Sequence, residues 1–189
     1  PLHRGPRPDF PRADSGCLRR ARRVSAVETK KDGGPVGTVL LFARFPVAGK
    51  AKTRTIPALG AVGAARLHRR LAEHAVAAAR EARTHTGLSI TVCFTGARRR
   101  DFRAWLGPDL HYRRQPGGDL GRRMRHGFER ALAHGKGRAV AAGTDVPGIS
   151  GERLRQAFEA LDTHDVVLGP AGDGGSTLLG MKRCHPALF

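Results

Sequence analysis

Short apolar runs alternate with amphipathic stretches along the chain from residue 36 onward. The first run, Val39-Leu40-Leu41-Phe42, is bounded by Gly37 and Pro46, which is typical of a strand buried on both faces of a parallel sheet. The segment Ala58–Arg83 then predicts a long helix. Its expected apolar stripe consists of Leu67, Leu71, Ala75 and Ala78, with His68, Arg69, Glu73 and Arg80 mainly outside it.

The same alternation continues to the end of the chain. Further strands are predicted at 88–94, 110–115, 138–142, 165–170 and 178–181, and further helices at 98–106, 119–134 and 150–161. Asp119 and Ser150 are candidate N-caps of the last two helices. The helix after Asp119 has an expected core-facing stripe of Leu120, Met124, Phe128 and Leu132. The order predicts an α/β fold: a mostly parallel sheet with helices on both faces.

Residues 1–35 differ from the rest of the chain. They are rich in Pro, Arg and Gly, show no apolar periodicity, and predict a disordered leader ahead of a domain at 36–189. The leader is either an Arg-rich tail with a role of its own or the product of a misplaced start. Because the sequence stops straight after a predicted strand and turn, we expect a C-terminally truncated domain from a longer reading frame.

Composition narrows the classes of function. The net charge of +18 suggests nucleic acid, but the cations are spread over helices and loops, and one Trp, one Tyr and eight Phe provide few stacking surfaces, so nucleic-acid binding is disfavoured. No apolar run is long enough to cross a bilayer and no signal-peptide pattern is present, so we expect a cytoplasmic protein. The three cysteines lack a CxxC motif, which disfavours a disulfide framework or a zinc site.

Cations gather in the loop after the first predicted strand. Gly49 turns the chain, and Lys50, Lys52 and Arg54 follow at a spacing that would point them to one side of an extended loop. The loop is not a Walker A motif, since Arg44 stands where that motif needs glycine. A surface loop of a basic protein is the simpler alternative. We favour phosphate binding, because open α/β sheets bind ligands at the carboxyl ends of their strands.

Two aspartates, Asp145 and Asp173, follow predicted buried strands within glycine-rich turns. Each alone could be an ordinary turn residue. Together with a cationic loop at the same sheet edge, they predict a site for a nucleoside diphosphate with Mg²⁺ or Mn²⁺, because these hard cations prefer oxygen ligands.

Four segments in order resemble one known family. They are FARFPVAGKAKTR at 42–54, QPGGDLGRRM at 115–124, AAGTDVPGI at 141–149 and VVLGPAGDGGSTLLGM at 166–181. Together they are similar to the bacterial DUF2064 family, also described as transferase 1 associated with radical-SAM and selenoprotein-like domains. The resemblance implies the three-layer α/β/α, Rossmann-like GT-A fold of the nucleotide-diphospho-sugar transferases.

The resemblance also implies roles for individual residues. The loop cations would hold the nucleotide phosphates, Asp145 would bind the metal and act in catalysis, and the catalytic Asp173 would lie where the acceptor meets the donor sugar. The nucleotide-binding set is Arg44, Gly49, Lys50, Lys52, Arg54, Gln115, Asp119, Arg123, Gly174 and Gly175. Three features depart from the family: Ser176 and Thr177 replace two aromatic residues, Arg122 replaces an acid, and the family continues past Phe189.

The predicted function is a metal-dependent glycosyltransferase that uses a nucleotide-sugar donor and an unknown acceptor. Its cofactor would be Mg²⁺ or Mn²⁺. Two alternatives stay open. One is a nucleotidylyltransferase of the same fold, which would use a nucleoside triphosphate, like the enzymes that load phospholactate or molybdopterin with a nucleotide. The other is a degenerate protein that only binds nucleotides.

Overall fold

The computed structural model describes residues 37–133, 137–172 and 175–189. The predicted leader and two of the predicted site residues, Asp173 and Gly174, lie outside the described residues. No helix in the described part of the chain is long and apolar enough to cross a membrane.

Six strands form one sheet in the order β3-β2-β1-β4-β6-β5. Their bounds are β1 Thr38–Arg44, β2 Ser89–Thr95, β3 His111–Arg114, β4 Ala139–Gly143, β5 Val166–Pro170 and β6 Ser176–Met181. Strands β1 to β4 are parallel to one another, whereas β6 runs antiparallel to both β4 and β5. Residues 171–175 between β5 and β6 are too few for the crossover that a parallel pair needs, which accounts for the reversal. The predicted mostly parallel sheet is confirmed.

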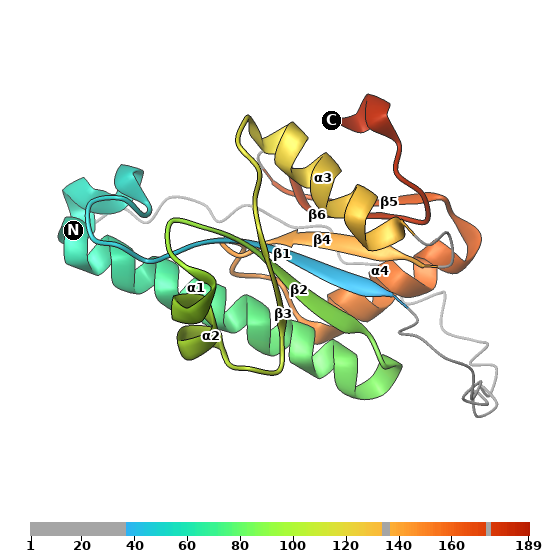
Figure 1. The fold of residues 1–189 in the computed structure, drawn as a ribbon, viewed down its shortest axis with the longest axis horizontal. Helices are drawn as coiled ribbons and strands as arrows, with labels where there is room; N and C mark the ends of the chain where they lie inside the picture. The colour runs from blue at the N-terminus through green and yellow to red at the C-terminus, as the bar shows by residue number, and fades with distance from the viewer. Residues whose placement is uncertain (1–36, 134–136, 173–174) are drawn as a thin grey trace, which may run out of the picture. The chain divides into compact units, whose positions relative to one another are not determined.

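Helices cover both faces of this sheet, as predicted (Figure 1). The bounds are α1 Ile56–Thr86, α2 Arg99–Leu106, α3 Leu120–Leu132 and α4 Gly151–Thr163, with 3₁₀ turns η1 Thr53–Thr55 and η2 Pro186–Leu188. Helices α1, α2 and α4 pack on one face, and α3 packs on the other. Asp119 and Ser150 cap α3 and α4 by accepting backbone N–H groups of Arg122 and Arg153 at 2.8 and 3.2 Å.

Alternate residues of the central strand β1 separate the two halves of the core. Val39 and Leu41 face α1 and α4, whereas Leu40 and Phe42 face α3. Helix α3 approaches β1 closely at Gly127, where a Cβ atom would lie 2.9 Å from the Phe42 ring. The fold therefore depends on a small residue at this point of α3.

Cys93 on β2 is buried among the core residues beneath α3, as the sequence predicts. Burial raises the pKa of the Cys93 thiol to about 11, although the nearby charge of Arg113 partly opposes the shift. The thiol is therefore neutral at physiological pH and serves as a small core residue.

The predicted core stripe of α1 is wrong by one position at its start. Leu67 is exposed, whereas His68 is buried and its Nε2 lies 2.9 Å from the backbone oxygen of Arg44. The buried face instead uses small residues, including Ala72 and Ala79. Small side chains let α1 lie close to the sheet. The hydrogen bond to Arg44 offsets the cost of removing the His68 imidazole from water.

The predicted stripe of α3 fails only at its first residue. Phe128 is fully buried and Met124 and Leu132 are partly buried, but Leu120 is 65% exposed. The helix begins at the sheet edge, beyond the strands that bury its later turns, so periodicity alone did not show where the core ends.

Asp109 lies in the loop between α2 and β3 and ties this loop to α1 through two arginines. Its carboxylate accepts from Arg80 Nη2 at 2.6 Å and from Arg83 Nη2 at 2.7 Å, while Arg80 also donates to the carbonyl of Leu106. The hydrogen bond from Arg80, with that from Arg83, holds the pKa of the Asp109 carboxyl well below its usual range.

We expect Asp109→Ala to lower the free energy of unfolding by about 1 kcal/mol at neutral pH, because the network is partly exposed to solvent. That corresponds to a loss of about 2–4 °C in Tm. A depressed carboxyl pKa stabilises the fold above the unfolded-state pKa, so the difference from wild type should shrink as the pH falls below about 4. Scanning calorimetry at several pH values measures this difference in stability, with Asp165→Ala as the control. A loss of stability in Asp109→Ala that stays the same below pH 4 would contradict this account.

Candidate functional site

The carboxyl ends of the parallel strands meet at one edge of the sheet, which we call the carboxyl edge. Side chains tie these ends together. Thr144, after β4, donates from Oγ1 to the carbonyl of Phe42 on β1 at 2.9 Å. Gln115, after β3, donates from Nε2 to the carbonyl of Cys93 on β2 at 2.6 Å. These hydrogen bonds fix the starts of the loops that carry the predicted site residues.

The loop after β1 is coiled rather than extended. The N–H of Lys50 donates to the carbonyl of Val47 at 3.0 Å, and Arg44 folds back to donate to the carbonyl of Lys50 at 3.2 Å. Because the loop is not extended, the spacing of Lys50, Lys52 and Arg54 does not place them on one side of it. Lys50 and Arg54 lie exposed at the surface. Gly49 supplies the turn with a φ of 76°.

Lys52 has a φ of 50°, which makes it the one non-glycine residue with positive φ in the described part of the chain. A left-handed conformation costs a residue with a Cβ roughly 1–2 kcal/mol, and such strain concentrates at functional sites. The 3₁₀ turn η1 begins directly afterwards at Thr53. The backbone at Lys52 is therefore held in an unfavourable conformation by the loop around it.

The side chain of Lys52 reaches across the carboxyl edge to Asp145. Its Nζ lies 3.2 Å from Oδ2 of Asp145, in the loop after β4, and so joins two of the predicted site residues. The side chains are 25% and 58% exposed, respectively. A ligand can therefore reach both charges from solvent.

A cavity of about 330 Å³ lies beside this ion pair. Its floor and walls are largely apolar and include Phe42 from β1 with Leu120 and Met124 from α3, and Asp145, Ser176 and Thr177 supply its polar groups. The exposed Leu120 is thus part of the wall of a cavity, one helical turn from Met124. The sequence pattern identified both residues but assigned Leu120 to the core.

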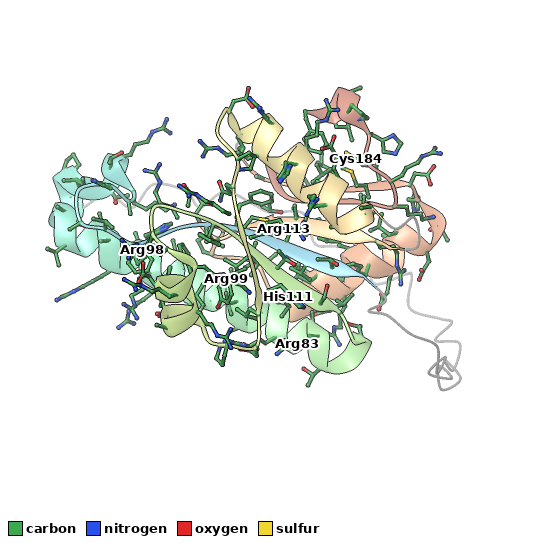
Figure 2. All side chains as sticks on the ribbon, viewed as in Figure 1. Arg83, Arg98, Arg99, His111, Arg113 and Cys184 are labelled. Atoms are coloured by element: carbon green, nitrogen blue, oxygen red, sulfur yellow. The ribbon has the colours of Figure 1, made fainter. Side chains whose placement is uncertain are left out.

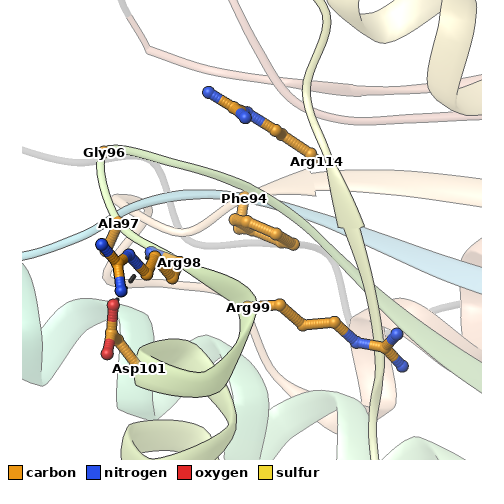
Figure 3. A pocket seen from close by; sticks show the side chains of 7 residues that line it. All are labelled: Phe94, Gly96, Ala97, Arg98, Arg99, Asp101 and Arg114. Carbon is orange, nitrogen blue, oxygen red and sulfur yellow. Dashed lines mark hydrogen bonds between the residues drawn. The ribbon is translucent and has the colours of Figure 1, made fainter.

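A second cavity, of about 770 Å³, opens at the same edge beside the ends of β2 and β3. Figure 3 shows Arg98, Arg99 and Arg114 around the ring of Phe94. None of the predicted site residues lines this cavity. Sequence reasoning missed it, although the run of three arginines that starts at Arg98, shortly after the end of β2, was a usable signal.

The remaining predicted residues have varied surroundings. Asp119 is occupied as the cap of α3, and the amide of Gln115 is engaged by backbone carbonyls. Arg123 is partly buried and its Nε has no hydrogen-bond partner among the described residues. The carbonyl of Gly175 accepts from the N–H of Ala171 at 2.9 Å. Direct nucleotide contacts by these residues stay predictions.

Acidic metal ligands are sparse at this edge. The described residues contain no group of three His, Cys, Asp or Glu side chains that could share a metal ion. Asp145 can therefore supply one carboxylate, and the other ligands of an octahedral ion would have to come from water and substrate oxygens.

The family of DUF2064, described as uncharacterized proteins conserved in bacteria, matches residues 76–189. The chain belongs to this family. The recognition made from the four segments is thereby confirmed. No curated protein sequence matches this DUF2064 chain.

A crystal structure from Desulfovibrio desulfuricans, provisionally assigned as a nucleotide-diphospho-sugar transferase, is 31% identical with a TM-score of 0.69. The match covers 82% of this chain and 66% of that protein, so the chain spans slightly less than two thirds of its relative. The 4-diphosphocytidyl-2C-methyl-D-erythritol synthase of Anaerococcus prevotii is 11% identical over 82% of this chain and 74% of its own, with a TM-score of 0.50. The second likeness shows the fold alone. The DUF2064 chain therefore has the nucleotide-diphospho-sugar transferase fold.

Proposed function

We propose that this protein transfers a group from a nucleotide donor, and that the transferred group is a sugar. The observation that carries the proposal is the ion pair between Lys52 and Asp145 at the carboxyl edge, beside a cavity of about 330 Å³. Ligands of open α/β sheets bind at this edge. A cation and a carboxylate on separate loops suit a diphosphate and the metal ion that accompanies it.

The ion pair implies an exchange of partners on binding. Without ligand, the ammonium of Lys52 neutralises the carboxylate of Asp145. A diphosphate carries more negative charge than one carboxylate and competes for Lys52, which frees Asp145. The coiled loop keeps Lys52 beside the diphosphate, and Lys50 and Arg54 add positive charge from the same loop. These charges stabilise the negative charge that develops on the departing diphosphate.

The single carboxylate of Asp145 suits a metal ion that arrives with the nucleotide and takes its other ligands from it. Asp145 would hold it, and diphosphate oxygens and water would complete its coordination. Bound Mg²⁺ or Mn²⁺ would neutralise charge on the leaving diphosphate. The competition from Lys52 explains why a metal should bind weakly until a nucleotide is present.

The cavity beside the pair supports glycosyl transfer. Its volume suits a sugar or part of an acceptor, and it lies next to Asp145. An acceptor hydroxyl would attack the anomeric carbon, the bond from that carbon to the diphosphate would break, and the hydroxyl proton would pass to a base. Asp173 stays the predicted residue for that base, and it lies outside the described residues.

Nucleotidyl transfer is the second candidate. The loop after β1 and the strand end before it carry four cations, Arg44, Lys50, Lys52 and Arg54, which also suit the higher charge of a triphosphate. In that reaction the acceptor would attack the α-phosphate and pyrophosphate would leave.

A thermal-shift screen with nucleotide sugars and nucleoside triphosphates, each with and without Mn²⁺, tests the proposal. We expect a nucleotide sugar to raise Tm more with Mn²⁺ than without it. Product analysis then separates the candidates, because glycosyl transfer releases a nucleoside diphosphate and nucleotidyl transfer releases pyrophosphate. Absence of any nucleotide-dependent shift would contradict both candidates, whereas a shift without any product would favour the degenerate protein that only binds nucleotides.

A further inference from the structure

A cavity of about 370 Å³ lies on the face of the sheet that α3 leaves partly open. We call it the cationic groove. Its polar lining includes Ser89 and Thr91 of β2, His111 and Arg113 of β3, Arg130 of α3 and Arg99 of α2. Figure 2 shows Arg99, His111 and Arg113 near strand β3.

The pleat of the strands explains how the groove forms. Alternate residues share a face, so Ser89 and Thr91 lie on the same side of β2 as the buried Cys93, which packs beneath α3. His111 pairs with Thr91, and Arg113 pairs with Cys93. Polar residues replace apolar ones where β2 and β3 extend beyond the cover of α3. The groove lies toward the starts of β1 and β2, away from the pair of Lys52 and Asp145, and of its lining residues only Arg99 also lines the cavity around Phe94.

The charges in the groove are unbalanced. No Asp or Glu lines it. Within the described ranges, Arg99, Arg113 and Arg130 each lack a hydrogen-bond or ion-pair partner, whereas Arg69, Arg80, Arg83, Arg125 and Arg138 each contact a carboxylate. Three guanidinium groups from three different elements therefore surround one cavity without an acceptor.

Of the three arginines, Arg113 gives the strongest indication that the groove binds an anion. It projects from the edge strand of the sheet and is half-buried, so water reaches its five N–H donors only in part. Burying part of a charged group without a partner is unfavourable. Arg99 comes from the first turn of α2 on the opposite face, and Figure 3 shows its side chain extending toward β3, away from Arg98 and Asp101.

The chemistry of the lining selects an anion. Planar guanidinium groups match the oxygens of a phosphate, and the hydroxyl of Thr91 can donate a further hydrogen bond, whereas that of Ser89 already bonds Thr38 and the carbonyl of Gly37. A volume of about 370 Å³ falls in the range of small-molecule sites. We propose that the cationic groove is a second binding site, for a small phosphorylated ligand, separate from the pair of Lys52 and Asp145. This inference does not rest on the proposed transferase activity.

Isothermal titration with pyrophosphate, without divalent metal, tests the groove. The titration uses the full chain carrying Lys52→Ala, which should weaken phosphate binding at the carboxyl edge. We expect pyrophosphate still to bind this protein. Adding Arg113→Gln or Arg130→Gln should weaken that binding roughly tenfold to a hundredfold, because each removes a charge-assisted contact. Arg70→Gln, which removes an exposed charge on α1 outside the groove, is the matched control and should have little effect.

Three results would overturn the inference. One is binding that Arg113→Gln and Arg130→Gln weaken no more than Arg70→Gln does. A second is no binding at all in the Lys52→Ala protein. The third is single-stranded RNA that binds more tightly than pyrophosphate with affinity rising with length, which would show a nucleic-acid surface instead. None of these results bears on nucleotide binding by the protein with Lys52 intact, so failure here is distinct from failure of the transferase proposal.

Discussion

Replacing Asp145 with asparagine should remove the Mn²⁺-dependent part of nucleotide affinity while the protein still folds. Asparagine keeps the size and the turn-forming capacity of aspartate but loses its charge. Asp145 is more than half exposed and forms an ion pair with Lys52, so little packing depends on it. The backbone before it stays fixed, because Thr144 donates to the carbonyl of Phe42.

The measurement is the Kd of a nucleoside diphosphate with and without Mn²⁺, for wild type, Asp145→Asn and the control Asp165→Asn. Asp165 also lies near cations, Lys182 and Arg183, but at the start of β5, at the opposite end of the strands from the carboxyl edge. We expect the ratio of the two Kd values to approach one only in Asp145→Asn. If that protein is folded and still binds more tightly with Mn²⁺, Asp145 is not the metal ligand and Asp173 becomes the first candidate.

Lys52→Ala should weaken nucleoside diphosphate binding roughly tenfold to a hundredfold, the loss expected for one charge-assisted contact to phosphate. Stability should change by less than about 1 kcal/mol, since the ion pair with Asp145 is exposed to solvent. Calorimetric titration and a thermal melt measure the two effects. Lys182→Ala, in another exposed pair, is the control for lost charge.

Lys52→Gly separates function from backbone strain. Glycine adopts positive φ without the Cβ penalty, so this variant should be at least as stable as Lys52→Ala. Its affinity for the diphosphate should still fall, because the ammonium is gone. A Lys52→Ala or Lys52→Gly protein with wild-type affinity would show that the strained loop serves the fold rather than phosphate binding.

The two site residues should also behave as a coupled pair. Because Lys52 and Asp145 are in contact, the effects of Lys52→Ala and Asp145→Asn on Mn²⁺-dependent binding should not add in the double variant. A double variant whose loss equals the sum of the single losses would indicate that the residues contact different parts of the ligand independently.

The sequence by itself determined the order of the elements and the edge of the sheet at which the candidate site lies. Buried apolar runs, helical periodicity and capping residues such as Asp119 and Ser150 are local signals, and the structure has the strands and caps where these signals indicate. The parallel order then places the loops after β1 and β4 at one edge, so a cationic loop and Asp145 could be assigned to a common site before their geometry was known.

Only the tertiary structure decided which of these residues meet. Lys52 and Asp145 are far apart in sequence, and they pair because β1 and β4 are neighbours in the sheet. Burial of His68 in place of Leu67 depends on the carbonyl of Arg44, and the exposure of Leu120 depends on where the sheet ends beneath α3. The cavity around Phe94 and the cationic groove likewise each join side chains from several elements. Periodicity reports the conformation of one segment, whereas contacts between segments depend on strand order, and no local pattern encodes that.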